Sequence, residues 1–335
     1  MGLPLVLVIS FFSASVLAFL LTPAMRGLAR KLGFMDLPDI LKSHREPVPY
    51  LGGLSIYAAF MLSAMGALFI SGLMGLKPLG LAAGATVVCG LGILDDKKRL
   101  SVSTKLLGQI VAAGILIMSG LRLEIIYFPL WANVLLSIVW IVGITNALNM
   151  VDIMDGLASS LAAISAATFF FIAVPTGDLF TAVVSVALVG ACIGFTGYNW
   201  HPASIFMGDA GSLLLGFLLA AISISTSYTA KNDIALLSPL LILAVPIYDT
   251  FYVSFLRMAR GKSPFRGSHD HFALRLRAIG LADRYVVVVI CLVSLVLSEA
   301  SYIATTVSLL GAAFIYLFTV IVLVAVGRLL SRVET

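Results

Sequence analysis

The sequence has few charged side chains and no long polar segment. Only 11% of its 335 residues are Asp, Glu, Lys or Arg, whereas 61% are hydrophobic. A chain with so few polar side chains cannot cover the surface of a water-soluble globule, so its solvent must be lipid. Its longest polar stretches, 24–50 and 257–284, are too short to build a soluble domain. We therefore predict that residues 1–335 form a single all-α, polytopic transmembrane domain.

Cysteine is scarce, and its placement excludes two kinds of site. Cys89, Cys192 and Cys291 all lie within apolar runs, without the paired spacing of a zinc site or a disulfide framework. They are predicted to be packing residues. The first apolar run is not expected to be a cleaved signal peptide, because Arg26 and Arg30 follow it instead of preceding it.

What the sequence does contain is a series of apolar runs suited to crossing a bilayer. A helix needs about 20 residues to span roughly 30 Å of hydrocarbon. Eleven runs approach or exceed that length, and ten spans are the alternative count. The predicted spans cover 3–23, 51–73, 78–94, 104–119, 131–147, 156–174, 180–198, 211–228, 234–256, 284–303 and 305–327.

Basic residues are distributed unequally between the loops that join these spans. If the N-terminus lies outside, 18 Lys and Arg residues fall on inner segments and only Lys77, Arg122 and Lys231 on outer ones. With eleven spans, the positive-inside rule then predicts an outer N-terminus and a cytoplasmic C-terminus. The basic residues form no basic helix and no patch interleaved with aromatics, so no nucleic-acid partner is expected.

Asn and Asp residues cluster at the predicted cytoplasmic ends of the spans. Because carboxylates at the edge of hydrocarbon are costly, they usually pair with cations, coordinate a metal or line a wet cavity. Converging oxygen ligands without cysteine favour Mg²⁺, with Mn²⁺ as an alternative, and Mg²⁺ commonly accompanies a diphosphate substrate. The pattern therefore indicates phosphoryl transfer. The clusters contain Asp95, Asp96, Asn146, Asn149, Asp152, Asp155, Asn199, His201 and Asp209, with His269 and His271 in the last large inner loop.

These clusters also have structural interpretations. Asp155 and Asn149 could cap helices, and Asp249, inside the ninth span, could be a buried hydrogen-bonded carboxyl. The glycines beside Asp209 could form a turn or allow the backbone to approach a phosphate closely. The last large inner loop, 257–284, carries His269 and His271 and is called the histidine loop below. Its cations could bind substrate phosphate or anionic lipid headgroups, and they include Lys262, Arg266, Arg275 and Arg277.

Four segments, in order on one predicted membrane face, resemble a known superfamily. The chain resembles glycosyltransferase family 4, which contains the polyprenyl-phosphate N-acetylhexosamine-1-phosphate transferases and the related phospho-N-acetylmuramoyl-pentapeptide transferases. The resemblance covers nearly the whole chain. The Lys42-Ser-His44, Pro47-Val-Pro49 and Gly52-Gly53 run is more similar to the first branch. The four segments are 36–53, Asp95-Asp96 with Lys105, 146–158 and 199–212.

The resemblance implies transfer of a HexNAc 1-phosphate, GlcNAc 1-phosphate first among them, from a UDP-sugar to polyprenyl (undecaprenyl) phosphate with release of UMP. This would be the first membrane step of a cell-envelope glycan pathway, such as cell-wall or lipopolysaccharide synthesis, in a bacterial inner (plasma) membrane. The pentapeptide branch is one alternative. A secondary transporter is another, but no inverted repeat is evident and the polar clusters fall at one face. Direct transfer and a covalent phosphate on an Asp both stay open, and a homodimer is one possible assembly.

The resemblance also implies residue roles. Mg²⁺ would be held by Asp209 and Asp152, while Phe206 could stack on uracil. Because a lipid phosphate is largely dianionic at pH 7, a general base, for which Asp95 is the candidate, should matter less than positioning. The predicted catalytic residues are Asp95, Asp96, Asp209, His269 and His271. The predicted substrate-binding residues are Lys42, His44, Lys105, Asn146, Asn149, Asp152, Asp155, Asn199, Phe206 and Arg266.

The histidine loop departs from the family pattern. Members carry a run such as His-x-His-His or His-His-His, whereas this chain has His269-Asp270-His271. A carboxylate at this position changes the local charge. The identity of the donor sugar is therefore left open by the sequence.

Overall fold

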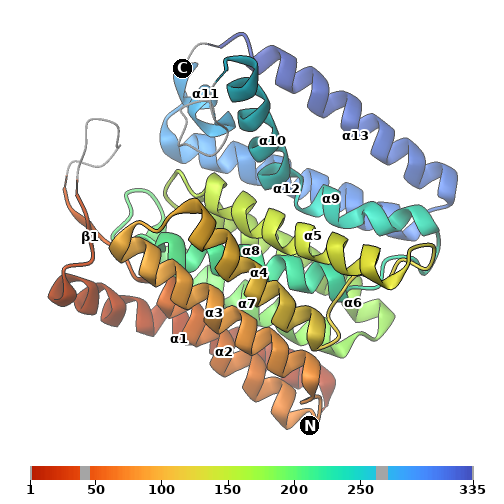
Figure 1. Cartoon of the computed structure of the whole chain (residues 1–335), viewed down its shortest axis with the longest axis horizontal. Coiled ribbons are helices and arrows are strands. Elements are labelled where there is room, and N and C mark those ends of the chain that lie inside the picture. Colours follow the sequence, from red (N-terminus) through yellow and green to blue (C-terminus); the bar gives the residue numbers. More distant parts are fainter. Residues whose placement is uncertain (1, 38–45, 262–270, 334–335) are drawn as a thin grey trace.

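The computed structural model describes residues 2–37, 46–261 and 271–333, which form a bundle of long helices with one short antiparallel ribbon (Figure 1). Figure 1 places the N-terminus at the end of the bundle away from this ribbon. The elements are α1 (Leu3–Leu32), β1 (Met35–Asp36), β2 (Val48–Pro49), α2 (Gly52–Ile70), α3 (Leu76–Lys98), α4 (Val102–Met118), α5 (Leu130–Val151), α6 (Leu157–Thr176), α7 (Leu179–Asn199), α8 (Gly208–Ser225), η1 (Asp233–Leu237), α9 (Ser238–Ile242), α10 (Ala244–Ala259), α11 (Phe272–Ala278), α12 (Asp283–Thr306) and α13 (Leu309–Leu330).

Each predicted span contains a helix, so the all-α polytopic fold is confirmed. Nine helices of the described chain are long and apolar enough to cross a membrane, or up to ten if a bent pair counts as one span. The remaining predicted span corresponds to α4, a shorter apolar helix of 17 residues. The count of eleven therefore stays a prediction.

The ninth predicted span is not one straight helix. The segment Asp233–Ile242 meets α10 at 71°. Pro246 explains the break, because it has no N–H to donate to the carbonyl of Ile242 in a continuous helix. That carbonyl instead accepts a hydrogen bond from Ser165 Oγ at 3.1 Å. The bend therefore turns α10 away from the axis of α9.

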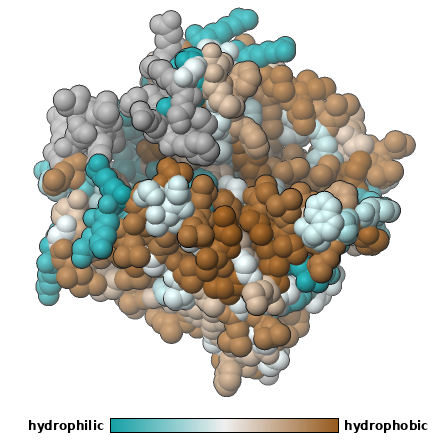
Figure 2. All heavy atoms as spheres, in the orientation of Figure 1, coloured by the Kyte–Doolittle hydropathy of each residue, from teal (hydrophilic) through white to brown (hydrophobic). Residues whose placement is uncertain are grey.

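Helix α8 forms the centre of the bundle and α13 its periphery. In the apolar 18-residue segment of each helix, 78% is buried inside the protein for α8 but only 11% for α13. Helix α8 packs against α2, α3, α5, α6 and α7. Figure 2 shows apolar side chains over most of the central part of the visible face, with hydrophilic residues towards its margins. This distribution is what a bilayer requires of a membrane protein.

The Gly52-Gly53 pair fastens the ribbon to the loop that precedes α8. The N–H of Gly52 donates to the carbonyl of Phe206 at 3.0 Å, and that of Gly53 to the carbonyl of Met207 at 2.9 Å. A Cβ on Gly53 would lie only 2.2 Å from the backbone nitrogen of Gly211. Only glycine at position 53 lets the two backbones come this close. The contact fixes the start of α8 and the position of Phe206.

Candidate active site

A polar cavity of about 760 Å³ opens where the ends of several helices meet the β1–β2 ribbon. Its wall comes from the end of α3, the start of α4, the segment after α5, the end of α7, the start of α8, and α11. Residues far apart in the sequence therefore share one site. The predicted site residues that line it are Asp95, Asp96, Lys105, Asn149, Asp152, Asp155, Asn199, Phe206 and Asp209.

Lys105 joins two of the carboxylates in this cavity. Its Nζ lies 2.5 Å from Asp95 Oδ2 and 2.8 Å from Asp209 Oδ2. Asp95 is fixed further because the N–H of Leu100 donates to its Oδ1 at 2.6 Å. Partly buried charges need such compensation, since removing one partner leaves the other uncompensated. The Lys105 ammonium therefore ties α4 to the end of α3 and the start of α8.

Asp96 accepts hydrogen bonds at the N-terminus of α8. The N–H groups of Asp209 and Ala210 point to its carboxylate oxygens, at 2.8 and 3.3 Å. The first N–H groups of a helix lack partners within it and carry the positive end of its dipole, so a carboxylate is stabilised there. Gly208 makes room for it, because a Cβ would lie 2.5 Å from Asp96 Oδ2 and the residue has φ 68°. Asp96 and Asp209 are thereby held side by side.

Asp155 does not cap the following helix. The N-cap of α6 is Gly156, and Asp155 Oδ2 instead accepts a hydrogen bond from the N–H of Ala203 at 3.0 Å and lies 3.0 Å from His201 Nδ1. The capping interpretation of Asp155 is therefore wrong. The carboxylate joins the segment after α5 to the segment after α7.

The two asparagines of α5 have different surroundings, although they lie one turn apart. Asn149 Nδ2 donates to Asp209 Oδ1 at 2.8 Å and to Ser212 Oγ at 2.9 Å, so it orients Asp209 and is not a helix cap. Asn146 forms a reciprocal amide pair with Gln109 of α4, at 2.6 and 3.2 Å. Asn146 does not line the polar cavity. The structure thus gives it a contact between helices, and its role in substrate binding stays a prediction.

Phe206 and Asn199 are both held by the backbone around them. The N–H of Phe206 donates to the carbonyl of Pro49 at 2.9 Å, and its ring centroid lies 6.5 Å from that of Tyr50. Asn199 Nδ2 donates to the carbonyl of Ile205 at 3.0 Å, and its Oδ1 accepts from the N–H of Gly156 at 3.1 Å. Asn199 therefore supports the loop that carries Phe206.

The cavity contains residues that the sequence did not single out as site residues, namely Asp36, Tyr50, Arg99 and Arg277. The hydroxyl of Tyr50 donates to Asp36 Oδ1 at 2.6 Å. Burial and this carboxylate raise the pKa of Tyr50, so its hydroxyl stays protonated. Signals for two of them were present: Asp36 begins a family-like segment, and Arg277 belongs to the last basic loop. No pattern indicated that Tyr50 would meet this site.

His271 lies outside the polar cavity. Its ring is buried, and its Nδ1 is 2.7 Å from Asp249 Oδ2 on α10. The interpretation of Asp249 as a buried hydrogen-bonded carboxyl is confirmed. Arg275, one of the cations expected to meet phosphate, is also buried and donates to the carbonyls of Leu330 and Val333. Four further predicted site residues lie outside the described part of the chain: Lys42, His44, Arg266 and His269.

Asp152 and Asp209 are the predicted metal ligands. Burial and the nearby carboxylates of Asp209, Asp96 and Asp155 raise the pKa of Asp152 to about 8. Within the described residues, no group of three or more His, Cys, Asp or Glu side chains is arranged to hold a metal ion. Mg²⁺, however, commonly takes one or two carboxylates and completes its shell with water and substrate phosphates. The donor set therefore fits a cation that binds together with a diphosphate.

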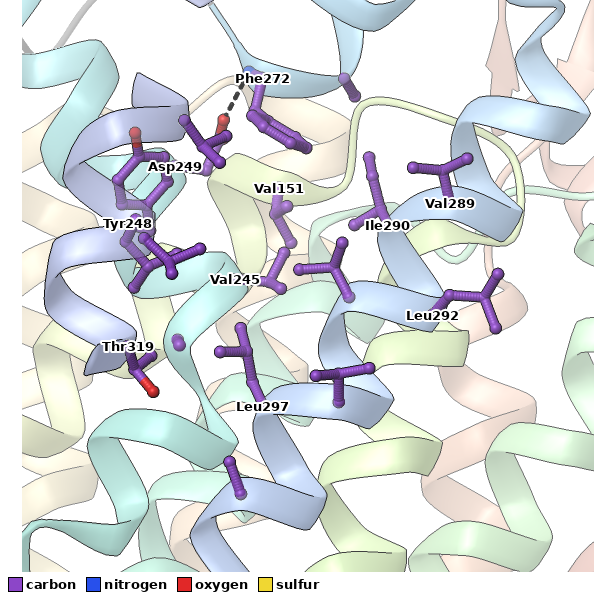
Figure 3. A pocket seen from close by; sticks show the side chains of 18 of the residues that line it. Val151, Val245, Tyr248, Asp249, Phe272, Val289, Ile290, Leu292, Leu297 and Thr319 are labelled. Atoms are coloured by element: carbon purple, nitrogen blue, oxygen red, sulfur yellow. Dashed lines mark hydrogen bonds between the residues drawn. The ribbon is translucent and has the colours of Figure 1, made fainter. Parts of the chain in front are cut away.

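An apolar cavity of about 590 Å³ adjoins the polar one (Figure 3). It lies between α10, α12 and α13, and Ile153, just past α5, lines both cavities. Figure 3 shows Leu297, Ile290 and Val245 around this space, with Asp249 and Phe272 joined by a hydrogen bond at one end. The molecule thus offers charge and hydrocarbon surface next to each other.

Fold and site together define a polytopic membrane protein with an acidic cavity at one end of its helix bundle. The sequence pattern of glycosyl transferase family 4 matches residues 78–227, which include nearly all of α3 and the whole of α4, α5 and α8, and hence most of the cavity wall. A relative that covers 98% of this chain agrees with this match. The chain belongs to glycosyl transferase family 4.

Three relatives show how far the similarity extends. A probable undecaprenyl-phosphate N-acetylglucosaminyl 1-phosphate transferase of Bacillus subtilis is 31% identical, covering 98% of this chain and 92% of the relative. The decaprenyl-phosphate N-acetylglucosaminephosphotransferase of Mycobacterium tuberculosis is 35% identical over 84% of this chain and 78% of its own. A phospho-N-acetylmuramoyl-pentapeptide-transferase of Halalkalibacterium halodurans is 34% identical, covering 81% of this chain and 88% of the relative.

Proposed function

We propose that this protein transfers a HexNAc 1-phosphate, GlcNAc 1-phosphate in the first place, from a UDP-sugar to polyprenyl phosphate and releases UMP. The observation that carries the proposal is the junction of a charged cavity with an apolar one, because the acceptor joins a phosphate to a long hydrocarbon chain. Two relatives whose names specify undecaprenyl or decaprenyl phosphate support it.

In the proposed reaction an oxygen of the lipid phosphate attacks the phosphorus that carries the sugar. A new P–O bond forms, the P–O bond to UMP breaks, and its electron pair leaves with UMP. The lipid phosphate is largely dianionic near pH 7, so no side chain has to remove a proton first. Lys105 and Arg277 supply positive charge to the phosphates. Asp95 and Asp96 already accept hydrogen bonds within the protein, which favours direct transfer over attack by either carboxylate.

Asp209 and Asp152 are the residues that would hold Mg²⁺, or Mn²⁺ as the alternative. When bound, the ion would neutralise charge on the diphosphate and on departing UMP. Both carboxylate oxygens of Asp209 accept hydrogen bonds, one from Lys105 and one from Asn149. Lys105 would therefore release Asp209 and turn to a phosphate, while Asn149 keeps the carboxylate oriented. Repulsion among the carboxylates near Asp152 supports the need for a cation.

The uracil ring would stack on Phe206. This ring lies in the cavity wall, and the backbone bonds to Pro49 and Gly52 limit its movement. A ring held in place before binding loses little freedom when a base stacks on it. Asn199 would contribute by holding the loop, and Tyr50 lies on the neighbouring wall.

The polyprenyl chain would lie in the apolar cavity and continue along the lipid-facing surface of the bundle. Ile153 lines both spaces, so a phosphate in the polar cavity could be followed directly by its hydrocarbon chain. Helices α10, α12 and α13 supply the apolar side chains. Burial of hydrocarbon contributes about 0.8 kcal/mol per CH₂ when it is removed from water. Since the acceptor already resides in lipid, the cavity gains little of this energy and selects the chain by its shape.

The pentapeptide branch is the second candidate, and the relative from Halalkalibacterium halodurans favours it. That similarity covers 81% of this chain, against 98% for the Bacillus subtilis relative. A transporter is disfavoured because the carboxylates gather at one end of the bundle and not near its middle. The basic loops support a cytoplasmic cavity, an outer N-terminus and a cytoplasmic C-terminus in a bacterial plasma membrane.

The test incubates the purified protein with Mg²⁺, undecaprenyl phosphate and one UDP-sugar at a time, and measures UMP. The donors are UDP-GlcNAc, other UDP-HexNAc sugars and UDP-N-acetylmuramoyl pentapeptide. UMP that appears only with lipid is expected for UDP-GlcNAc. Turnover with the pentapeptide donor alone would move the protein to the second branch, and no lipid-dependent UMP with any donor would contradict the proposal.

A further inference from the structure

The short helix α11 forms a partition between the two cavities. Leu274 and Arg277 line the polar cavity, whereas Phe272 and Ala273 line the apolar one. Figure 3 shows the ring of Phe272 at the end of the apolar space, next to Asp249. A shift of this one helix would therefore change both cavities together.

The N-terminus of α11 is fixed by one carboxylate of α10. Asp249 Oδ2 lies 2.7 Å from His271 Nδ1. Asp249 Oδ1 accepts a hydrogen bond from the N–H of Phe272 at 2.8 Å (Figure 3). Asp249 is 3% exposed and His271 6%. A second attachment follows one turn later, where Arg275 donates to the carbonyls of Leu330 and Val333. Helix α11 is thus tied to α10 and to the C-terminal end of α13.

The buried position of Asp249 costs free energy, so the contacts that offset this cost indicate what the residue does. Apolar side chains supply nearly all of the wall of the cavity beside it. A carboxylate in such surroundings is strongly unfavourable unless it is paired and hydrogen-bonded. Its two oxygens satisfy two donors that both belong to the start of α11. The contact holds this helix in one place better than apolar packing could, because hydrogen bonds are directional.

We propose that Asp249 and His271 act as a positioning pair that holds α11, with Phe272 in the acceptor cavity and Arg277 in the donor cavity. His271 acts through its Nδ1 bond to Asp249 and does not touch the reacting phosphates. This inference rests on the proposed transferase function only for its kinetic consequences. The contact itself is independent of that function.

Two substitutions of His271 separate positioning from catalysis. The amide nitrogen of Asn takes the place of Nδ1, whereas that of Gln takes the place of Nε2. We expect His271→Asn to retain most of the wild-type kcat. We expect His271→Gln and Asp249→Ala to raise the KM for polyprenyl phosphate, roughly tenfold or more, with a smaller change in kcat. If both His271 variants abolish kcat and leave KM unchanged, the imidazole is catalytic and the proposal is overturned.

A double variant and an exchange measurement complete the test. Asp249→Ala with His271→Ala should be no worse than the poorer single variant, because both remove the same contact. Multiplied effects would contradict the pair. Hydrogen exchange of the α11 amides should accelerate in Asp249→Ala but not in the control Asp233→Ala, an exposed residue of η1. Unchanged exchange in α11 overturns the proposal even if the wild-type protein releases no UMP, an outcome that would count against the transferase function alone.

Discussion

The two adjoining cavities are built by different forces. In the polar cavity Asp95, Asp96, Lys105, Asn149 and Asp209 form a continuous set of hydrogen bonds and ion pairs across four helices. The apolar cavity is enclosed by aliphatic and aromatic side chains, and Asp249 with the start of α11 is its main polar contact.

The difference follows from the bilayer as a solvent. Hydrocarbon offers no hydrogen bonds, so polar groups must be satisfied within the protein, and each one fixes the direction of its partner. Apolar side chains in lipid gain mainly from close packing, which tolerates small changes of shape. We therefore expect substitutions in the polar cavity to reduce turnover severely and substitutions in the apolar cavity to reduce it mildly.

The largest effect is expected for Asp209→Asn. The amide retains the shape but removes the negative charge for Mg²⁺ and for Lys105, so turnover should fall by about 10³-fold while the protein stays folded. UMP release at several Mg²⁺ concentrations measures this, with a thermal melt in detergent as the check on folding. Near-normal turnover at ordinary Mg²⁺ would remove Asp209 from the metal site. Asp233→Asn, outside both cavities, serves as the matched control.

A somewhat smaller loss, about 10²-fold, is expected for Lys105→Met. Methionine keeps the unbranched chain but leaves Asp95 and Asp209 without their shared cation. Lys105→Arg should recover part of the rate, because the positive charge returns with a different shape. Equal activity of Met and Arg variants would mean that the charge is not needed. Steady-state kinetics with both substrates varied provides the comparison.

Removal of the Phe206 ring should weaken donor binding specifically. By analogy with bases stacked on aromatic residues, Phe206→Ala should cost about 1 to 3 kcal/mol, or about 5- to 150-fold in the KM for the UDP-sugar. The KM for polyprenyl phosphate should stay close to that of the wild type. Phe206→Tyr is the control that keeps the ring. An unchanged donor KM in the alanine variant would refute stacking.

The smallest effect should arise in the apolar cavity. Ala300→Phe places a ring in the space beside α12, and we expect about a fivefold increase in the KM for a long-chain polyprenyl phosphate. A short-chain acceptor should be unaffected, because its hydrocarbon need not reach that depth. Ala83→Phe, on an exposed face of α3, is the matched control. If the long and short acceptors respond alike, the chain does not lie in this cavity.

Sequence reasoning succeeded where chemistry leaves a local pattern. Apolar runs marked a helix in each predicted span, and Asp96, Asn149 and Asp209 stood out because polar residues at the edge of hydrocarbon are rare. It could not find the contacts of a side chain whose partner lies on a distant segment. Asn146 lies in the same Asn- and Asp-rich segment as Asn149, yet its side chain forms hydrogen bonds with Gln109 outside the polar cavity. His271 was expected among the catalytic residues because its loop is basic, but it lies against Asp249.

The sequence by itself determined that the chain is an all-α membrane protein, because hydrophobic length and composition are properties of local segments. It also marked the face on which the carboxylates gather. Only the tertiary structure decided which polar groups meet: that Lys105 lies between Asp95 and Asp209, and that α10 bends. The physical reason is that a hydrogen bond or ion pair depends on two positions and a direction. These arise only when distant segments pack together.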